Sequence, residues 1–134
     1  MSTHNSRLQV GFILAGITNF CIILFSRGYS NSLGLVDAHF DTGGCLLITL
    51  WGAAYISIAR NYSTVPWLCV VFGIEKLFYV SRWVLFLSSS PNFDAIWNND
   101  PLAAIFFGIY GLVDAAYGLF FFYAGFTPLK SRGN

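Results

Sequence analysis

Three charged side chains lie near the centres of long apolar stretches, and their types and positions are suited to chemistry. Glu75 and Lys76 are neighbours in the middle of one stretch, and Asp114 is in the middle of the next. In apolar surroundings, carboxylate and ammonium groups hold protons, bind ions or ligands, or pair with one another, because leaving such a charge unpaired is costly. We therefore expect these three residues to belong to one polar cluster.

The neighbours of these charges extend the candidate cluster. Residues three or four apart share a face of a helix, which places Tyr79 and Arg82 on one stripe with Glu75. Lys76 is turned away from Glu75 by about 100°, so its side chain is free to reach Asp114. The four charges sum to zero and suit two acid–base pairs, Lys76 with Asp114 and Arg82 with Glu75.

Aromatic and amide side chains at a similar depth complete the candidate cluster. Tyr110 and Tyr117 share the helix face of Asp114, and Asn19 lies a little past the centre of the first apolar stretch. No catalytic residue is assigned. The predicted binding site or intramembrane polar cluster comprises Asn19, Glu75, Lys76, Tyr79, Arg82, Tyr110, Asp114 and Tyr117.

The composition indicates that membrane-spanning helices position these residues. Hydrophobic residues make up 56% of the 134 residues and charged residues only 10%, whereas soluble domains contain about 25% charged residues. A bilayer core of ~30 Å requires about 20 apolar residues in a helix. We predict an all-α fold in which the whole chain, 1–134, is a single four-helix transmembrane domain. Its four transmembrane helices cover about residues 8–25, 43–59, 65–87 and 101–126 of this integral membrane bundle.

Residues at the ends of these stretches support the predicted helices. Asp41 precedes the second helix, and Asp100 followed by Pro101 begins the fourth, so both aspartates are expected N-caps. A secretory signal peptide is the alternative for residues 8–25. No small-x-small cleavage pattern follows that stretch, so we interpret it as a true span.

The distribution of basic residues predicts the orientation of the chain. Four spans place both termini on one side, where Arg7, Arg60, Lys130 and Arg132 fall, whereas only Arg27 falls on the other side. The positive-inside rule then places both termini in the cytoplasm. We predict a multi-pass protein of the cell membrane, inner or plasma, whose first partner is the lipid bilayer.

Small residues recur along one seam of the fourth predicted helix. Helices in lipid associate through close van der Waals contact, which small side chains permit. We expect this seam to meet another helix of the same chain, while a homodimer or a larger membrane complex is the alternative. The seam consists of Ala104, Gly108, Gly111, Ala115, Gly118 and Gly125.

Several classes of site are disfavoured by what the sequence contains. The net charge is +1 and no basic stripe is present, which argues against nucleic acid as a partner. His4 and His39 both lie outside the predicted spans, so a membrane haem is not expected, and no cofactor is predicted. The motif Asp37-x-His39-x-Asp41 has ligand types for a metal, but we expect a solvated loop with a helix cap and assign no metal site.

Three functions are compatible with the polar cluster. The favoured one is a non-enzymatic membrane bundle that binds a small ligand or acts as an accessory subunit. The alternative is a small dimeric transporter that uses Glu75 and Asp114. A weaker alternative is a membrane enzyme acting on a lipid or isoprenoid, with Glu75 as acid or base. A transporter requires an aqueous path from both faces, an enzyme requires a cavity open to lipid with one acid unpaired, and a purely architectural ion pair requires no cavity.

Overall fold

The structure is a computed structural model that describes residues 3–132. Over these residues the protein is all-α and contains no strand. A break at Cys21 separates α1 from α2. Counted as one interrupted helix, these two segments give the described residues five α-helices in all. The elements are α1 (Thr3–Phe20), α2 (Ile22–Phe25), η1 (Ala38–Phe40), α3 (Thr42–Ile58), η2 (Tyr62–Thr64), α4 (Pro66–Ser88), α5 (Phe93–Asn99) and α6 (Pro101–Arg132), where η1 and η2 are short 3-10 helices.

The helical content of the prediction is confirmed, with differences at four places. The first predicted helix corresponds to α1 together with α2. The second, third and fourth correspond to α3, α4 and α6. Helix α5 was not predicted, because seven residues with a polar end carry no apolar run long enough to recognise. Helix α6 continues past the predicted end at residue 126 and includes Pro128. The chain also turns at η1 and η2, where no helix was expected.

Two of the four predicted spans are long and apolar enough to cross a membrane. These are Asn5–Phe25, which has 21 residues and includes α2, and Pro101–Ser131, which has 31. Helix α3 is apolar but shorter, with 17 residues. Helix α4 has 23 residues, and its charged residues Glu75, Lys76 and Arg82 lower its apolar character.

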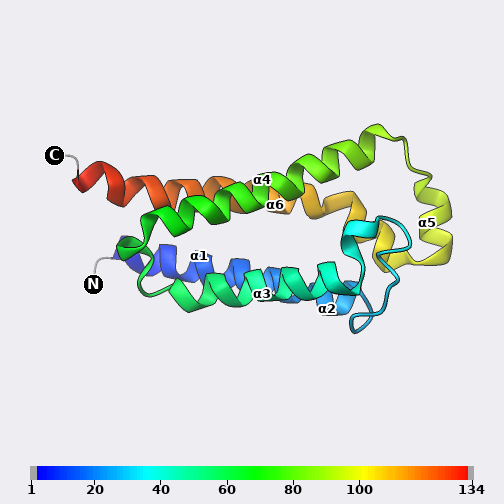
Figure 1. The fold of residues 1–134 in the computed structure, drawn as a ribbon, viewed down its shortest axis with the longest axis horizontal. Helices are drawn as coiled ribbons and strands as arrows, with labels where there is room; N and C mark the ends of the chain where they lie inside the picture. The colour runs from blue at the N-terminus through cyan, green and yellow to red at the C-terminus, as the bar shows by residue number, and fades with distance from the viewer. Residues whose placement is uncertain (1–2, 133–134) are drawn as a thin grey trace.

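The long helices are arranged in two closely packed pairs (Figure 1). Helix α1 packs against α3, and α4 packs against α6. The beginning of α1 and the end of α6 lie at the same end of the molecule, as the prediction of four spans requires. The opposite end holds α5 and the loop between α2 and α3.

Glycines allow the close approach within each pair. A Cβ atom added to Gly16 on α1 would lie 2.6 Å from the carbonyl oxygen of Gly52 on α3. The predicted seam on α6 is confirmed in part. A Cβ atom added to Gly118 or Gly125 would contact α4 at 3.3 Å or less, whereas one added to Gly108 would meet nothing within 4 Å. Gly108 therefore does not belong to the packed seam.

Two aromatic clusters form the core between the helix pairs. One, near the chain ends, includes the buried rings of Phe12, Tyr55, Phe72 and Phe121. The other, near the loop end, includes Phe40, Tyr79, Phe106, Phe107 and Tyr110. On α1, α4 and α6, the polar residues Asn19, Glu75, Lys76 and Asp114 lie between members of these two clusters. The fold therefore places a polar layer between two apolar ones.

Aspartates cap two helices as predicted. The backbone N–H of Gly44 donates a 2.7 Å hydrogen bond to Asp41 Oδ1 at the start of α3. Asp100 Oδ1 accepts from the backbone N–H groups of Leu102 and Ala103 at the start of α6. Such caps satisfy amide donors that have no partner within the helix. Arg27, just after α2, also donates to Asp100, at 2.8 Å, and so fastens the loop to α6.

The close contact between α1 and α3 predicts a difference between two glycine substitutions. Gly16→Ala should lower the free energy of unfolding by about 1–3 kcal/mol, because its methyl group would overlap the backbone of α3. Gly108→Ala is the control, and it should be neutral or stabilising by up to about 1 kcal/mol, because alanine favours helix more than glycine does. Thermal unfolding of the purified variants in detergent measures both. Equal destabilisation by the two substitutions would contradict the packing described.

The Arg27–Asp100 pair predicts an acid-dependent contribution to stability. The guanidinium donates hydrogen bonds to Asp100 and thereby lowers the pKa of this carboxyl below its usual value of 3.8. The stabilisation is therefore complete above pH 3.8 and is lost as the pH falls through the lowered pKa. Arg27→Gln should unfold at a lower temperature than wild type at about pH 5, and the difference should shrink towards about pH 2. A difference that does not change with pH would contradict this assignment.

Candidate functional site

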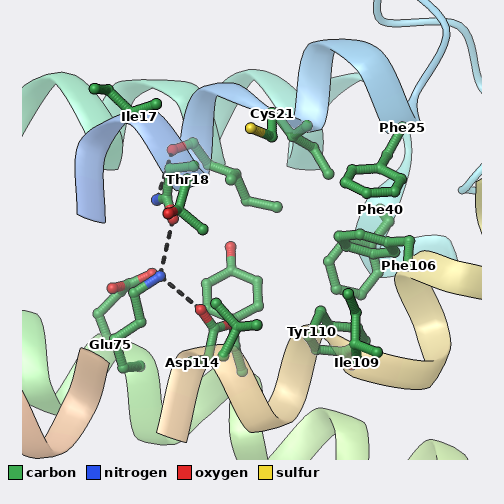
Figure 2. Close-up of a pocket in the computed structure, with 16 residues that line it drawn as sticks. Ile17, Thr18, Cys21, Phe25, Phe40, Glu75, Phe106, Ile109, Tyr110 and Asp114 are labelled. Atoms are coloured by element: carbon green, nitrogen blue, oxygen red, sulfur yellow. Dashed lines mark hydrogen bonds and ion pairs between the residues drawn. The ribbon is translucent and has the colours of Figure 1, made fainter. Parts of the chain in front are cut away.

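Lys76 lies at the centre of a hydrogen-bonded network between the two helix pairs. Its Nζ atom donates to Asp114 Oδ1 on α6 at 2.7 Å and to Asn19 Oδ1 on α1 at 3.0 Å. Figure 2 shows both interactions as dashed lines. Lys76 is only 2% exposed, so the ammonium group depends on these acceptors. The predicted ion pair between Lys76 and Asp114 is therefore confirmed.

Asn19 extends this network to α3. Its Nδ2 atom donates to the backbone carbonyl oxygen of Ile48 at 3.0 Å, while its Oδ1 atom accepts from Lys76. The two ends of one amide thus contact two different helices. Asn19 is buried, and both of its contacts fix the orientation of the side chain, because an amide can donate only from its nitrogen.

Tyr55 on α3 is a member of the site that the predicted cluster did not include. Its hydroxyl donates a short hydrogen bond to Glu75 Oε2 on α4. Its ring lies 5.3 Å from Lys76 Nζ, a distance at which the face of an aromatic ring attracts a cation. The sequence carries one signal for this role, a tyrosine in the middle of the second apolar stretch at the depth of Glu75.

The predicted pairing of Arg82 with Glu75 is wrong. Arg82 Nη2 lies 3.0 Å from His39 Nδ1 and 3.9 Å from Asp37 Oδ1, both in the loop before α3. Seven residues of helix separate Glu75 from Arg82, which is a rise of about 10 Å. Because the loop folds back over the end of α4, Asp37 is the carboxylate within reach. Arg82 therefore belongs to the loop end of the molecule and not to the central network.

The three predicted tyrosines have different surroundings. Tyr79 and Tyr110 line the cavity described below, and the ring of Tyr110 stacks on that of Phe106 with centroids 5.0 Å apart. Tyr117 lies outside the cavity lining, and its hydroxyl is 2.9 Å from Thr18 Oγ1 on α1. Tyr117 thus joins the helix pairs, whereas Tyr79 and Tyr110 form walls of the candidate site.

A cavity of about 230 Å³ adjoins the central network. Residues of α1 and α2 form one side, and residues of α4 and α6 form the other (Figure 2). Ile17 on α1 and Ile109 on α6 both line it and are 50% and 45% exposed, so the cavity reaches the lateral surface between these helices. The members of the predicted cluster that line it are Asn19, Glu75, Lys76, Tyr79, Tyr110 and Asp114.

The two ends of the cavity differ in chemistry. Figure 2 shows the rings of Phe25, Phe40 and Phe106 at one end and the carboxylates of Glu75 and Asp114 at the other. One carboxylate oxygen, Glu75 Oε1, has no hydrogen-bond partner among residues 3–132. The arrangement can therefore hold an apolar body and, at the carboxylate end, accept hydrogen bonds from a polar group.

The Asp37-x-His39-x-Asp41 motif serves the loop end of the fold. Asp37 Oδ1 accepts from the backbone N–H of His39 and so caps η1. Asp41 caps α3, as predicted. Within the described part of the chain, no group of three His, Cys, Asp or Glu side chains is placed to hold a metal ion.

Comparisons with known proteins identify no relative of this chain. No family model matches the sequence, no curated protein is similar to it, and no solved structure matches the fold. The geometry of the site is therefore the basis on which a function is assigned.

The Lys76–Asp114 pair predicts strong coupling between two substitutions. Lys76→Met should destabilise the protein by about 3–5 kcal/mol, because it leaves the Asp114 carboxylate buried without its cation. Adding Asp114→Leu should restore most of the loss, because the second change removes the stranded charge. Thermal unfolding of both single variants and of the double variant in detergent gives the coupling free energy.

Lys130→Met is the matched control, because it removes an exposed lysine near the end of α6. This control should unfold like wild type. Additive losses in the double variant, or wild-type stability of Lys76→Met, would reject a structural pair.

Proposed function

We propose that this protein crosses the cell membrane four times and binds a small, mainly apolar molecule that enters its lateral cavity from the lipid. The cavity between α1 and α6 is the observation that carries the proposal. A bundle whose ion pair served only to hold the helices together would need no such cavity. We favour binding without a reaction, because both carboxylates already accept hydrogen bonds within the protein. Asp114 accepts from Lys76, and one oxygen of Glu75 accepts from Tyr55.

Exposed apolar side chains support four spans. Monomers in water rarely expose large contiguous apolar surfaces, yet α3 and α4 carry them as α1 and α6 do. On α3, Leu47 and Leu50 are exposed, and on α4, Ile74, Phe78 and Leu85 are exposed. Such apolar helix faces are suited to contact with lipid.

The charges of α4 are compatible with a span in this arrangement. Glu75 and Lys76 point into the bundle and are buried, so they do not face lipid. Arg82 contacts the loop at the end of α4. A helix whose charges are paired inside a bundle or lie at its end can cross a bilayer.

The proposed orientation places both chain ends in the cytoplasm. The end of the molecule where α1 begins and α6 ends also carries Arg7, Arg60 and Lys130, whereas the opposite end carries Arg27 and Arg82. Cytoplasmic segments of membrane proteins are enriched in such residues. Association with a second copy or with a larger membrane complex stays a prediction.

The size and lining of the cavity define the class of ligand. An engineered apolar cavity of about 150 Å³ binds benzene, so a cavity of about 230 Å³ holds a somewhat larger body. Most of the lining is aliphatic or aromatic, and the charged side chains of Glu75, Lys76 and Asp114 lie at the carboxylate end. Such sites bind an apolar body tightly and use few polar groups to orient it.

One observation favours the enzyme alternative as a second candidate. Glu75 Oε1 has no hydrogen-bond partner among the described residues, and a general base must have an oxygen available to accept a proton. A lipid or isoprenoid that entered the lateral cavity would approach this carboxylate. Transport through Glu75 and Asp114 would instead require Asp114 to release Lys76 in each cycle.

Mass spectrometry of the natively purified protein tests the proposed binding. A small molecule should co-purify with wild type and be lost from Val113→Phe, because the added ring would occupy the cavity that Val113 lines. Leu119→Phe is the matched control on the same helix, since Leu119 is 74% exposed and outside the cavity lining. This control should retain the molecule.

Two results would contradict the proposal. One is a wild-type protein that carries no small molecule even after exposure to lipid extract. The other is equal retention by Val113→Phe and Leu119→Phe. Conversion of the retained molecule during incubation would favour the enzyme over the binding protein.

A further inference from the structure

The charges around the cavity do not balance. Within the part of the chain that the structure describes, Glu75 and Asp114 contribute two carboxylates to the lining, and Lys76 is its single cationic side chain. Arg82, the second cation expected from the sequence, contacts His39 and Asp37 instead. With every group ionised, the cavity lining therefore has a net charge of −1. An uncompensated buried charge is costly, so a cation or a proton is required to balance it.

Glu75 is the carboxylate that lacks a cation. Lys76 Nζ forms its ion pair with Asp114, and no ion pair joins it to Glu75 within the described residues. Glu75 Oε2 accepts from Tyr55, a neutral donor, and Oε1 accepts from no donor among residues 3–132. The side chain is only 9% exposed, so bulk water does not compensate it. A buried carboxylate oxygen without a partner requires a hydrogen-bond donor, and a positively charged donor forms the strongest hydrogen bond with it.

The rest of the lining suits a cation attached to an apolar body. The aromatic lining residues are Phe25, Phe40, Tyr79, Phe106 and Tyr110. Aromatic faces attract ammonium groups and also pack against hydrocarbon. Val113 and Ile109 add aliphatic surface from α6. The aromatic end and the carboxylate end of the cavity (Figure 2) thus match the two parts of an amphipathic amine.

We propose that the ligand is a small hydrophobic amine, bound as its ammonium form. Its N–H groups donate to the carboxylate of Glu75, and its apolar body lies among the aromatic rings. The inference rests on the proposed function, because it names the ligand class of the same cavity. A proton held by Glu75 would also balance the charge, and the experiment distinguishes the two.

The test compares two probes of the same shape that differ in charge. These are 2-phenylethylamine and 2-phenylethanol, titrated into the full-length protein in detergent at neutral pH by calorimetry. The amine is protonated at this pH, as alkylammonium groups with a pKa of about 10 are. It should bind at least about tenfold more tightly than the alcohol, because charge-assisted hydrogen bonds are stronger than neutral ones.

Two variants test whether the preference for the amine over the alcohol depends on the carboxylate of Glu75. Glu75→Gln should reduce the affinity for the amine to that for the alcohol, while the affinity for the alcohol stays unchanged. Retained alcohol binding also shows that this variant is folded. Asp94→Asn is the matched control, since it removes a carboxylate of α5 outside the cavity lining, and it should keep the full preference.

Each outcome decides the inference. Equal affinities of the wild type for the two probes would overturn it and leave the proposed function standing. If neither probe binds, both the inference and the proposed function fail. A preference for the amine that survives in Glu75→Gln would also overturn the assignment. If Glu75→Gln does not fold, the wild-type comparison still decides between amine and proton.

Discussion

The ammonium group of Lys76 joins the two helix pairs of this protein. From α4 it reaches Asp114 on α6 at 2.7 Å and Asn19 on α1 at 3.0 Å. Asn19 continues the contact to the backbone of α3 through Ile48. One buried charge therefore fixes the relative positions of four helices. The ammonium group is stable only where its acceptors lie within hydrogen-bond distance, so the helices that carry these acceptors must pack around it. The apolar clusters on both sides of this layer exclude water and make that requirement stricter.

The same constraint gives the site its character. Because Lys76 is held by Asp114 and Asn19, the neighbouring carboxylate of Glu75 relies on the hydroxyl of Tyr55. The cavity lies beside this unequal arrangement and reaches the lateral surface between α1 and α6. The joining of the helix pairs and the unequal pairing of the two carboxylates thus follow from one distribution of charged groups. A ligand that completes the hydrogen bonding of Glu75 would also complete the polar layer of the fold.

The sequence is sufficient to predict the long helices, because the length of an apolar stretch can be read directly from it. It is also sufficient to predict the Lys76–Asp114 pair, because each of these charges lies in an apolar stretch and needs a partner of opposite sign. It is insufficient for Arg82, whose partner depends on how the loop between α2 and α3 folds back. It is also insufficient for Tyr55, since only the rotation of α3 decides which of its polar side chains reaches Glu75. The cavity depends on the fit of side chains between α1 and α6, which no spacing encodes.

The most direct test of this account is the distance between Lys76 Nζ and the carboxyl carbon of Asp114. Solid-state NMR of the protein in lipid bilayers, with ¹⁵N in lysine side chains and ¹³C in aspartate carboxyls, measures it through their dipolar coupling. The account predicts a strong coupling, because the nitrogen lies 2.7 Å from an oxygen of that carboxyl. The coupling should vanish in Asp114→Asn when only aspartate is labelled. Absence of a strong coupling in wild type would contradict the central role of Lys76.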